Sequence, residues 1–392
     1  MSHHPLLRTF TASAIAATLL GACGGGGSGE ASGTLRLSLT DAPACGYDSA
    51  FVTVEKVRVH KSGSAGDSDS GWSEVVLATP QRIDLLTLTN GTLMPLGQTT
   101  LPAGSYTQMR LVLAANSAAN PLANAVKPTG GIETPLTTPS GQQSGLKMNI
   151  NIAIAPDTVA DFAIDFDGCK SFVKAGNSGQ IHLKPVLSVI PIVSTRIVGF
   201  VDASLAVPGT TVSAQVAGVP VRATPPDATG RFELFPVPTG TYDLVLSATG
   251  RVNAVMTGVP VTAAGATTIG STTARINTPL SASSFAASGT VSVNASVANT
   301  NASVSATQAL SGGPTIEVGH ANADVVTGAY SMSLPAGTPV KTAYVAGATS
   351  FSFAGNALDA GKYKLHASAP SFVDKTADIV LSAPVVTPFA FP

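Results

Sequence analysis

The chain contains 392 residues, more than one hydrophobic core normally holds and enough for two or three domains. It carries 21 basic and 22 acidic residues, so its formal net charge is −1, and this balance argues against a nucleic-acid-binding protein, which needs a basic face. Charged residues make up only 11%, while glycine and proline contribute 39 and 27 residues, so neither a helical protein nor a disordered chain fits. We therefore expect an all-β chain of tandem antiparallel β-sandwich or barrel domains.

The N-terminus reads as an export signal. Residues 10–20 form an apolar run of about eleven residues, too short to span a bilayer but suited to the apolar region of a signal peptide. The run ends in Leu20-Gly21-Ala22-Cys23, which resembles the lipobox of bacterial lipoproteins. The alternative is an ordinary signal peptide with an incidental cysteine. We expect residues 1–22 to be a lipoprotein signal peptide and residues 23–33 a flexible, glycine-rich tether.

The lipobox resemblance implies that Cys23 is acylated and that the protein is exported. Several acyl chains on one cysteine anchor a protein stably, whereas a single chain is marginal. Gly24 stands where lipoproteins retained in the inner membrane carry Asp. The resemblance therefore implies anchoring to the bacterial outer membrane, on its periplasmic or surface face.

Two cysteines remain after Cys23. Cys45 and Cys169 form an even pair in an oxidising compartment, and we expect a disulfide between them. The alternative is two buried thiols. No His or Cys lies near either of them in sequence, so we expect no metal site there.

Residues 34–193 read as a first β domain. Residues 34–40 alternate, with Leu35, Leu37 and Leu39 on one face, which is typical of a half-buried strand. The alternation in residues 51–60 slips at Glu55-Lys56, which predicts a β-bulge. We expect seven to nine antiparallel strands in this domain. The other strands are expected at residues 72–77, 82–88, 106–114, 145–154, 159–166 and 180–191.

Several separated blocks of this first domain are recognisable. LSLTDAPACGYDSAFVTVEKVRVH, GWSEV, RIDLLTLTNG, LPAGSYTQMRLVLA and DFDGCKSFVKAGNSGQIHLKPV resemble the family known as domain of unknown function 4382, from Gly33 to about Val193. Members of that family are mostly exported lipoproteins. The resemblance implies an exported β domain without an assigned activity.

Residues 196–277 read as a second domain. A D-x-x-G turn at residues 227–230 is followed by an aromatic strand and by P-x-G-x-Y at residues 238–242. Gly230 and Gly240 suit tight turns, and Tyr242 shares a strand face with Leu244. These motifs resemble the transthyretin-like carboxypeptidase regulatory domains, which implies a seven-stranded sandwich.

Residues 280–392 repeat this pattern loosely and predict a degenerate second copy of that sandwich. Tyr330 follows a Thr-Gly turn as Phe232 does, and Tyr363 echoes Tyr242, with a long insertion after Gly337. The first domain also has a Gly-Ser-Tyr at residues 104–106. There, strict alternation would put Met109 on the face opposite Tyr106, so we interpret that stretch as a shared turn and not as a repeat.

Catalytic and metal motifs are missing from the sequence. The four His after the signal are scattered, without the spacing of metal ligands: His60, His182, His320 and His366. We therefore expect no catalytic residue, no metal and no cofactor.

Two acidic groups and one aromatic residue have alternative interpretations. Asp67 and Asp69 could supply part of a Ca²⁺ site, but a solvated loop is the simpler interpretation. Asp161, Asp165 and Asp167 cluster near Cys169, and the alternation of Asp165 and Asp167 with Ile164 and Phe166 favours the outward face of a strand for these two. Trp72 is a candidate ligand contact as a sugar platform, although a lone Trp in an apolar strand is more often core.

Two functions fit these features. The first is a non-enzymatic, lipid-anchored cell-envelope protein whose β modules serve as spacer or interaction surface. The alternative is a carbohydrate-binding module protein of the envelope, by analogy of fold alone. The expected partners are the membrane, through acylated Cys23, and a polysaccharide or envelope protein, with no nucleic acid.

Overall fold

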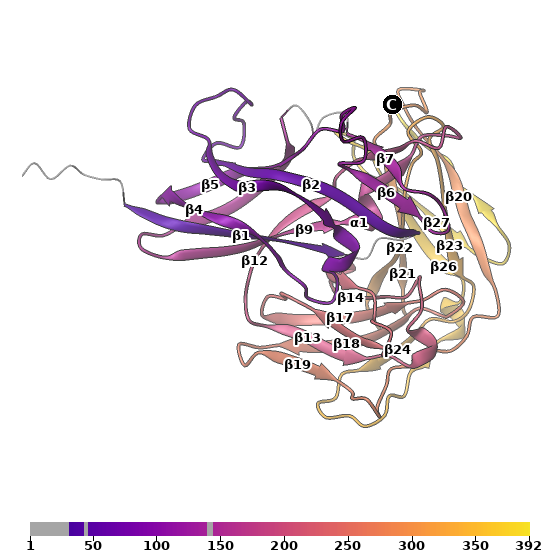
Figure 1. Cartoon of the computed structure of the whole chain (residues 1–392). Helices are drawn as coiled ribbons and strands as arrows, with labels where there is room; N and C mark the ends of the chain where they lie inside the picture. The colour runs from indigo at the N-terminus through magenta and orange to yellow at the C-terminus, as the bar shows by residue number, and fades with distance from the viewer. Residues whose placement is uncertain (1–30, 43–45, 139–143) are drawn as a thin grey trace, which may run out of the picture.

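The chain folds into three β-sandwiches that pack side by side, as the computed structural model shows for residues 31–42, 46–138 and 144–392 (Figure 1). The first sandwich spans residues 32–191, the second begins at residue 196, and the third spans residues 284–391. Each encloses its own apolar core. The expected all-β, tandem-sandwich architecture is confirmed.

The first sandwich consists of a four-stranded sheet, ordered β12-β9-β1-β4, and an eight-stranded sheet in which β2 pairs with β3, β5 and β6. Its strands are β1 (Ser32–Ala42), β2 (Tyr47–His60), β3 (Ser73–Asp84), β4 (Met94–Pro102), β5 (Gly104–Leu113), β6 (Ala125–Pro128), β7 (Thr134–Thr137), β8 (Leu146–Ile154), β9 (Val159–Asp167), β10 (Phe172–Lys174), β11 (Ile181–Leu183) and β12 (Leu187–Pro191). Its helices are the 3₁₀-helix η1 (Leu85–Leu88) and the one-turn α1 (Gly168–Ser171).

The alternating pattern in the sequence explains the strands of this first core. Leu35, Leu37 and Leu39 of β1 are fully buried, because alternate residues of a strand share one face. The register of β2 shifts between Val54 and Lys56, which confirms the predicted bulge. The sandwich differs from the expectation in strand number, with twelve strands in its described residues. It also contains parallel neighbours, since β1 and β9 run parallel.

The second sandwich packs the sheet β16-β13-β19 against the sheet β15-β14-β17-β18-β24-β25. Its own strands are β13 (Arg196–Phe200), β14 (Thr211–Val216), β15 (Val219–Thr224), β16 (Arg231–Leu234), β17 (Gly240–Ser247), β18 (Ala254–Val261) and β19 (Ala266–Ile269), with the 3₁₀-helix η2 (Ala203–Leu205). Two further strands, β24 (Val340–Ala343) and β25 (Ala354–Gly355), come from the insertion in the third copy. The range 280–392 therefore contributes to two sandwiches.

The third sandwich packs β20, β23, β28 and β29 against the sheet β22-β21-β26-β27. Its elements are β20 (Ser284–Val293), β21 (Ser303–Ala309), β22 (Thr315–Asn322), β23 (Ala329–Pro335), η3 (Ala357–Asp359), β26 (Lys362–Ser368), β27 (Lys375–Val380), β28 (Val385–Val386) and β29 (Phe389–Phe391). Tyr363, Leu365 and Ala367 of β26 point into its core, and the residues between them point outward.

The three sandwiches share one strand order. In the second, β13 pairs antiparallel with β16 and parallel with β19, while β14 pairs with β15 and β17, and β17 with β18. The third repeats these pairings with β20 to β23 and β26 to β29. The first repeats them with β1 to β5, β8 and β9. All three are therefore copies of one seven-stranded plan, to which the first adds strands.

This order corrects the interpretation of the Tyr106 turn as unrelated to the repeat. Tyr106 is the third residue of β5, as Tyr242 is the third residue of β17. The register between β5 and β8 shifts between Tyr106 and Gln108, and this bulge turns Met109 back into the same core as Tyr106. The prediction was wrong because it assumed unbroken alternation.

A tyrosine corner marks the same point in each sandwich. The hydroxyl of Tyr106 donates to the carbonyl of Pro102 at 3.0 Å, and that of Tyr242 donates to Pro238 at 2.8 Å. A buried tyrosine hydroxyl needs such a partner, and the bond fixes the turn into the strand.

Candidate functional site at the domain junction

A buried ion pair joins the first and second sandwiches. The guanidinium Nη1 of Arg222, on β15, lies 2.6 Å from the Oδ1 atom of Asp165, on β9, and Arg222 is only 4% exposed. Nη2 of Arg222 also donates to the hydroxyl of Thr40 at 3.4 Å. As the alternation predicted, Asp165 lies on the face of β9 opposite the core residues Ile164 and Phe166, and the second sandwich covers that face.

Asp41 lies beside this pair and is 1% exposed. Its Oδ1 accepts a hydrogen bond from the backbone N–H of Gly168 at 3.2 Å. Burial, and next the charge of Asp165, raise the pKa of Asp41 well above its ordinary value. The junction therefore holds a carboxyl group that favours its neutral form.

The third sandwich contacts the first through α1 and the residues after it. Lys170 Nζ lies 3.2 Å from Glu317 Oε1, and the Asn322 side chain donates to the carbonyl of Lys170 at 2.6 Å. The backbone N–H of Gly176 donates to Asp324 at 2.7 Å. Two short side chains of the third sandwich, Asn322 and Asp324, thus bind backbone groups of the first.

The second and third sandwiches also meet directly. The side-chain amide of Gln215 donates to the carbonyl of Glu317 at 2.8 Å and accepts from its N–H at 2.9 Å. Val245 and Val255 of the second sandwich pack against Leu310 and Ile316 of the third. Each sandwich therefore contacts both others, and the three close on one another.

A cavity of about 370 Å³ lies where all three sandwiches meet. Its wall is made of α1, the outer face of β14, and strands β22 and β23. The polar groups that line it come from every sandwich: Asp167, Lys170, Thr211, Ser213, Gln215, Ser247, Glu317, His320, Ser331 and Ser333. Ligand pockets usually have volumes of about 300–1,000 Å³, and this cavity falls within that range.

The titratable groups of the cavity influence one another. Burial lowers the pKa of Lys170, but the carboxylates of Glu317 and Asp167 outweigh it, and the net pKa is raised. Burial raises the pKa of Asp167. Burial, and next the charge of Lys170, lower the pKa of His320 to about 4. At neutral pH the wall therefore presents a charged ammonium and a neutral imidazole, which suits polar binding better than proton transfer.

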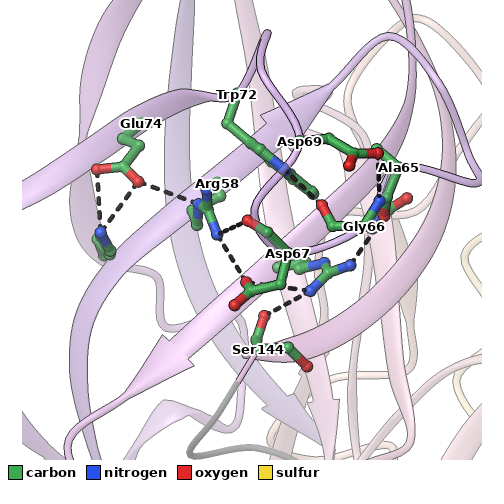
Figure 2. A network of polar contacts seen from close by, with 11 residues as sticks. Arg58, Ala65, Gly66, Asp67, Asp69, Trp72, Glu74 and Ser144 are labelled. Carbon is green, nitrogen blue, oxygen red and sulfur yellow. Dashed lines mark hydrogen bonds and ion pairs between the residues drawn. The ribbon is translucent and has the colours of Figure 1, made fainter.

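Trp72 lies in a polar network on the outer face of the first sandwich (Figure 2). Its indole N–H donates to the carbonyl of Gly66 at 3.0 Å, and the guanidinium carbons of Arg58 and Arg110 lie over its ring at 4.5 and 4.9 Å. The ring thus holds the loop of residues 61–71 against β2 and β5. Its contact with a ligand stays a prediction.

Asp67 and Asp69, in the loop of residues 61–71, belong to the same polar network. Asp67 Oδ1 lies 2.9 Å from Arg58 Nη1 and 3.5 Å from Arg110 Nη1, and Asp69 accepts from the N–H of Gly66 at 2.8 Å. Two guanidinium groups neutralise Asp67, which makes it a poor calcium ligand. Within residues 31–42, 46–138 and 144–392, no group of three or more His, Cys, Asp or Glu side chains could hold a metal ion.

The remaining predicted site residues are the cysteines. Cys23 and Cys45 lie outside the described residues, while Cys169 lies in α1 at the cavity wall. Sequence reasoning missed Arg222, Lys170 and Glu317. The one available signal was Arg222, a charge within an otherwise uncharged strand, V-P-V-R-A-T.

No helix in the described part of the chain is long and apolar enough to cross a membrane.

Comparison with known families agrees with the first resemblance. Residues 32–185 match the family model described as domain of unknown function (DUF4382). That match covers the first sandwich except β12, and less than half of the chain. No curated protein matches the chain.

Three similar solved structures share little sequence with this chain. A type II cohesin–X-dockerin complex from Acetivibrio cellulolyticus is 18% identical, over 21% of this chain and 56% of that one, with a TM-score of 0.18. The Bacillus anthracis TIE protein is 12% identical, over 92% of this chain and 50% of that one, with a TM-score of 0.17. The major pilin subunit of Bacillus cereus is 12% identical, over 92% and 99%, with a TM-score of 0.16. The chain thus spans about half the length of the first two.

Proposed function

We propose that the chain is a non-enzymatic, lipid-anchored cell-envelope protein whose three sandwiches act together as one interaction body. The observation that carries this proposal is the closed set of three interfaces around the polar cavity. A spacer gains reach from sandwiches arranged in a line with few contacts between them. Three mutually packed sandwiches give up that reach and gain a shared surface, which favours the interaction role over the spacer role.

The anchor in this proposal is Cys23, which lies outside the described residues. It precedes the first strand by only eight intervening residues, 24–31, most of them glycine. A flexible segment of that length has an end-to-end distance of about 15 Å. The body would therefore sit close to the outer membrane, on whichever face the lipid enters.

The second and third sandwiches resemble the transthyretin-like carboxypeptidase regulatory domains, and we propose this kinship for both. Asp227 Oδ1 accepts from the N–H groups of Thr229 and Arg231 at 2.8 and 3.0 Å. Asp324 Oδ1 accepts from Val326 and Thr327 at 2.9 and 2.8 Å. The same Asp-closed turn thus precedes the aromatic strand in both copies, which supports the proposal.

The electrostatics of the cavity support a binding role. The Lys170 amine is held protonated by two carboxylates, so it lacks the free lone pair that a nucleophile needs. The His320 ring nitrogen Nε2 lies 3.3 Å from Asn322 Oδ1, an amide oxygen that neither gives nor takes a proton. These groups can orient a polar partner by hydrogen bonds.

Metabolic labelling tests the anchor directly. A fatty-acid analogue should label the wild-type protein, and the labelled protein should be found in the outer-membrane fraction. The Cys23→Ser variant should remain unlabelled and be absent from that fraction. Equal labelling of both proteins would reject the lipid anchor.

A glycan array probed with the mature body tests the alternative function. We expect no saccharide-specific binding, because the one Trp is engaged with Arg58 and Arg110. Saturable binding to one polysaccharide class would replace the proposed function with the carbohydrate-binding one.

A further inference from the structure

The insertion in the third copy crosses to the second sandwich. We call residues 336–361 the strap. Within it, β24 runs parallel to β18, with Val340 opposite Ala254 and Ala343 opposite Thr257. The N–H groups of Val340 and Tyr344 donate to the carbonyls of Asn253 and Thr257, both at 2.9 Å. The strap therefore adds a hydrogen-bonded strand to a sheet that belongs to another sandwich.

The side chains of the strap complete the second core. Val340 is 7% exposed and belongs to the core cluster of the second sandwich, and Tyr344, Phe351 and Phe353 pack against that cluster. Phe353 closes one side of a small internal void lined by Leu244, Met256 and other core residues. Without the strap, this end of the core would be open to water.

The strand that receives the strap is unsuited to be an edge. β18 has the sequence AVMTGVPV, without a charged residue, and Val255 and Met256 are almost fully buried. β27 occupies the same position in the third sandwich, and it is the last strand of its sheet among the described strands. It reads KTADIV and exposes Lys375 and Asp378, the kind of charge that protects a free edge. The sequence of β18 is thus typical of a strand whose edge is covered by another strand.

We propose that the edge of β18, together with the apolar core residues that Phe351 and Phe353 cover, forms a peptide-binding groove whose occupant is the strap. The groove recognises an extended segment through the parallel backbone pairing and through the aromatic residues of F-S-F at residues 351–353. The strap is bound to the second sandwich by noncovalent contacts and covalently continuous with the third at both of its ends. The strap is therefore an intramolecular ligand of the second sandwich. A separate peptide of the same sequence can bind in its place when the strap is removed from the groove.

If the strap completes the second core, the second sandwich needs the strap in order to fold. Residues 196–277 contain seven strands of the plan but lack the strap. The second and third sandwiches then form one cooperative unit, because the core of the second includes side chains from the third copy. The sequence alone suggests instead that residues 196–277 bury a complete core of their own.

The direct test replaces residues 338–360 of the full-length protein by a Gly-Ser linker and adds a synthetic peptide of residues 338–356. We expect one-to-one binding in calorimetry, and restored protection of residues 254–257 from hydrogen exchange. A matched peptide with Phe351→Ser and Phe353→Ser should bind at least tenfold more weakly. Equal binding of both peptides, or full protection of β18 without any peptide, would overturn the proposal.

A second variant keeps the test decisive if the linker protein does not fold. In the intact chain, Phe351→Ser with Phe353→Ser should speed exchange at β24 and at residues 254–257 at least tenfold and leave β26 unchanged. The control is Val345→Ser, because Val345 lies in the same strap and is 63% exposed. Exchange at residues 254–257 equal to that of the control would contradict the proposal.

Discussion

The hydroxyl of Tyr363 donates to the carbonyl of Pro335 at 2.6 Å, although 28 positions separate the two residues. In the second sandwich the same bond joins Tyr242 and Pro238, four positions apart. In the third sandwich the strap lies between the two partners in sequence, and the tyrosine corner forms in spite of this insertion. The hydrogen bond of Tyr363 therefore fixes the turn into β26 even though the connection between its two partners is long.

Removing this hydroxyl should destabilise the protein. Tyr363→Phe leaves the Pro335 carbonyl without its donor, and it also removes the oxygen that Asn253 Nδ2 contacts at 3.2 Å. We expect a loss of about 1–3 kcal/mol in the free energy of unfolding, measured by denaturant titration. Tyr344→Phe is the control, since no hydrogen bond from the Tyr344 hydroxyl to the described residues is seen. An equal effect of the two changes would contradict the role of the corner.

The buried pair between the first and second sandwiches should be costly to break. Arg222→Met leaves Asp165 buried without its partner, and we expect a loss of about 3–5 kcal/mol. The double variant Arg222→Met with Asp165→Leu should recover much of that loss, because no charge then stays buried. A double-mutant cycle measured by chemical denaturation gives the coupling energy.

A matched surface pair supplies the control for this cycle. Lys364 and Asp378 lie 3.5 Å apart with side chains 49% and 81% exposed. Lys364→Met should cost under about 1 kcal/mol, because solvent screens the pair. A loss of the same small size for Arg222→Met would show that the junction is not held by the buried pair.

The raised pKa of Asp41 predicts a stability that depends on pH. Folding raises this pKa, so between the ordinary value of an aspartate and the raised value the folded state binds more protons than the unfolded state. Stability therefore falls as the pH rises through this interval. The protein should be more stable at pH 5 than at pH 7. Asp41→Asn should remove a slope of up to about 1.4 kcal/mol per pH unit.

Thermal or chemical unfolding at several pH values measures this slope. Asp378→Asn serves as the control, since Asp378 is exposed on β27. A slope between pH 5 and 7 that Asp41→Asn leaves unchanged would rule out Asp41 as its source.

The predicted Cys45–Cys169 disulfide is supported by the residues that flank the two cysteines. Ala42 lies opposite Asp167 in the pairing of β1 with β9, and the Tyr47 ring lies 5.2 Å from the Phe172 ring. Cys45 falls between Ala42 and Tyr47 in sequence, as Cys169 falls between Asp167 and Phe172. Peptide mapping without reductant should find the two cysteines linked.

Replacing both cysteines by Ser should lower stability by about 2–5 kcal/mol, as for other native disulfides. The single variants should behave like the double variant, because either one alone abolishes the bond. Quantitative alkylation of both thiols in the unreduced protein would disprove the link.

Local patterns in the sequence are sufficient to predict much of each sandwich. The burial of Leu35, Leu37 and Leu39 follows from period-two alternation, and the slip at Glu55 marks the bulge in β2. The bulge after Tyr106 was missed because the polar and charged residues that follow it are buried. Gln108 and Arg110 are both under 7% exposed, so polarity does not report the face there.

The junction could not be predicted in this way. Arg222 and Asp165 lie in different sandwiches, and no periodicity connects residues that meet only when two folded bodies dock. The strap was visible only as an insertion of unknown purpose after Gly337. Its strand, V-K-T-A, is short and carries a charge, so the sequence gives no sign that it pairs with β18.

Small-angle X-ray scattering of the mature chain without its lipid tests the central claim, which is that the three sandwiches form one closed body. We expect a compact particle with a single-peaked distance distribution. Its radius of gyration should lie near the value of about 21 Å that a compact chain of roughly 360 residues has, with a small addition from the tether. An elongated particle with several separated peaks, one for each spacing between sandwiches in a row, would contradict the account.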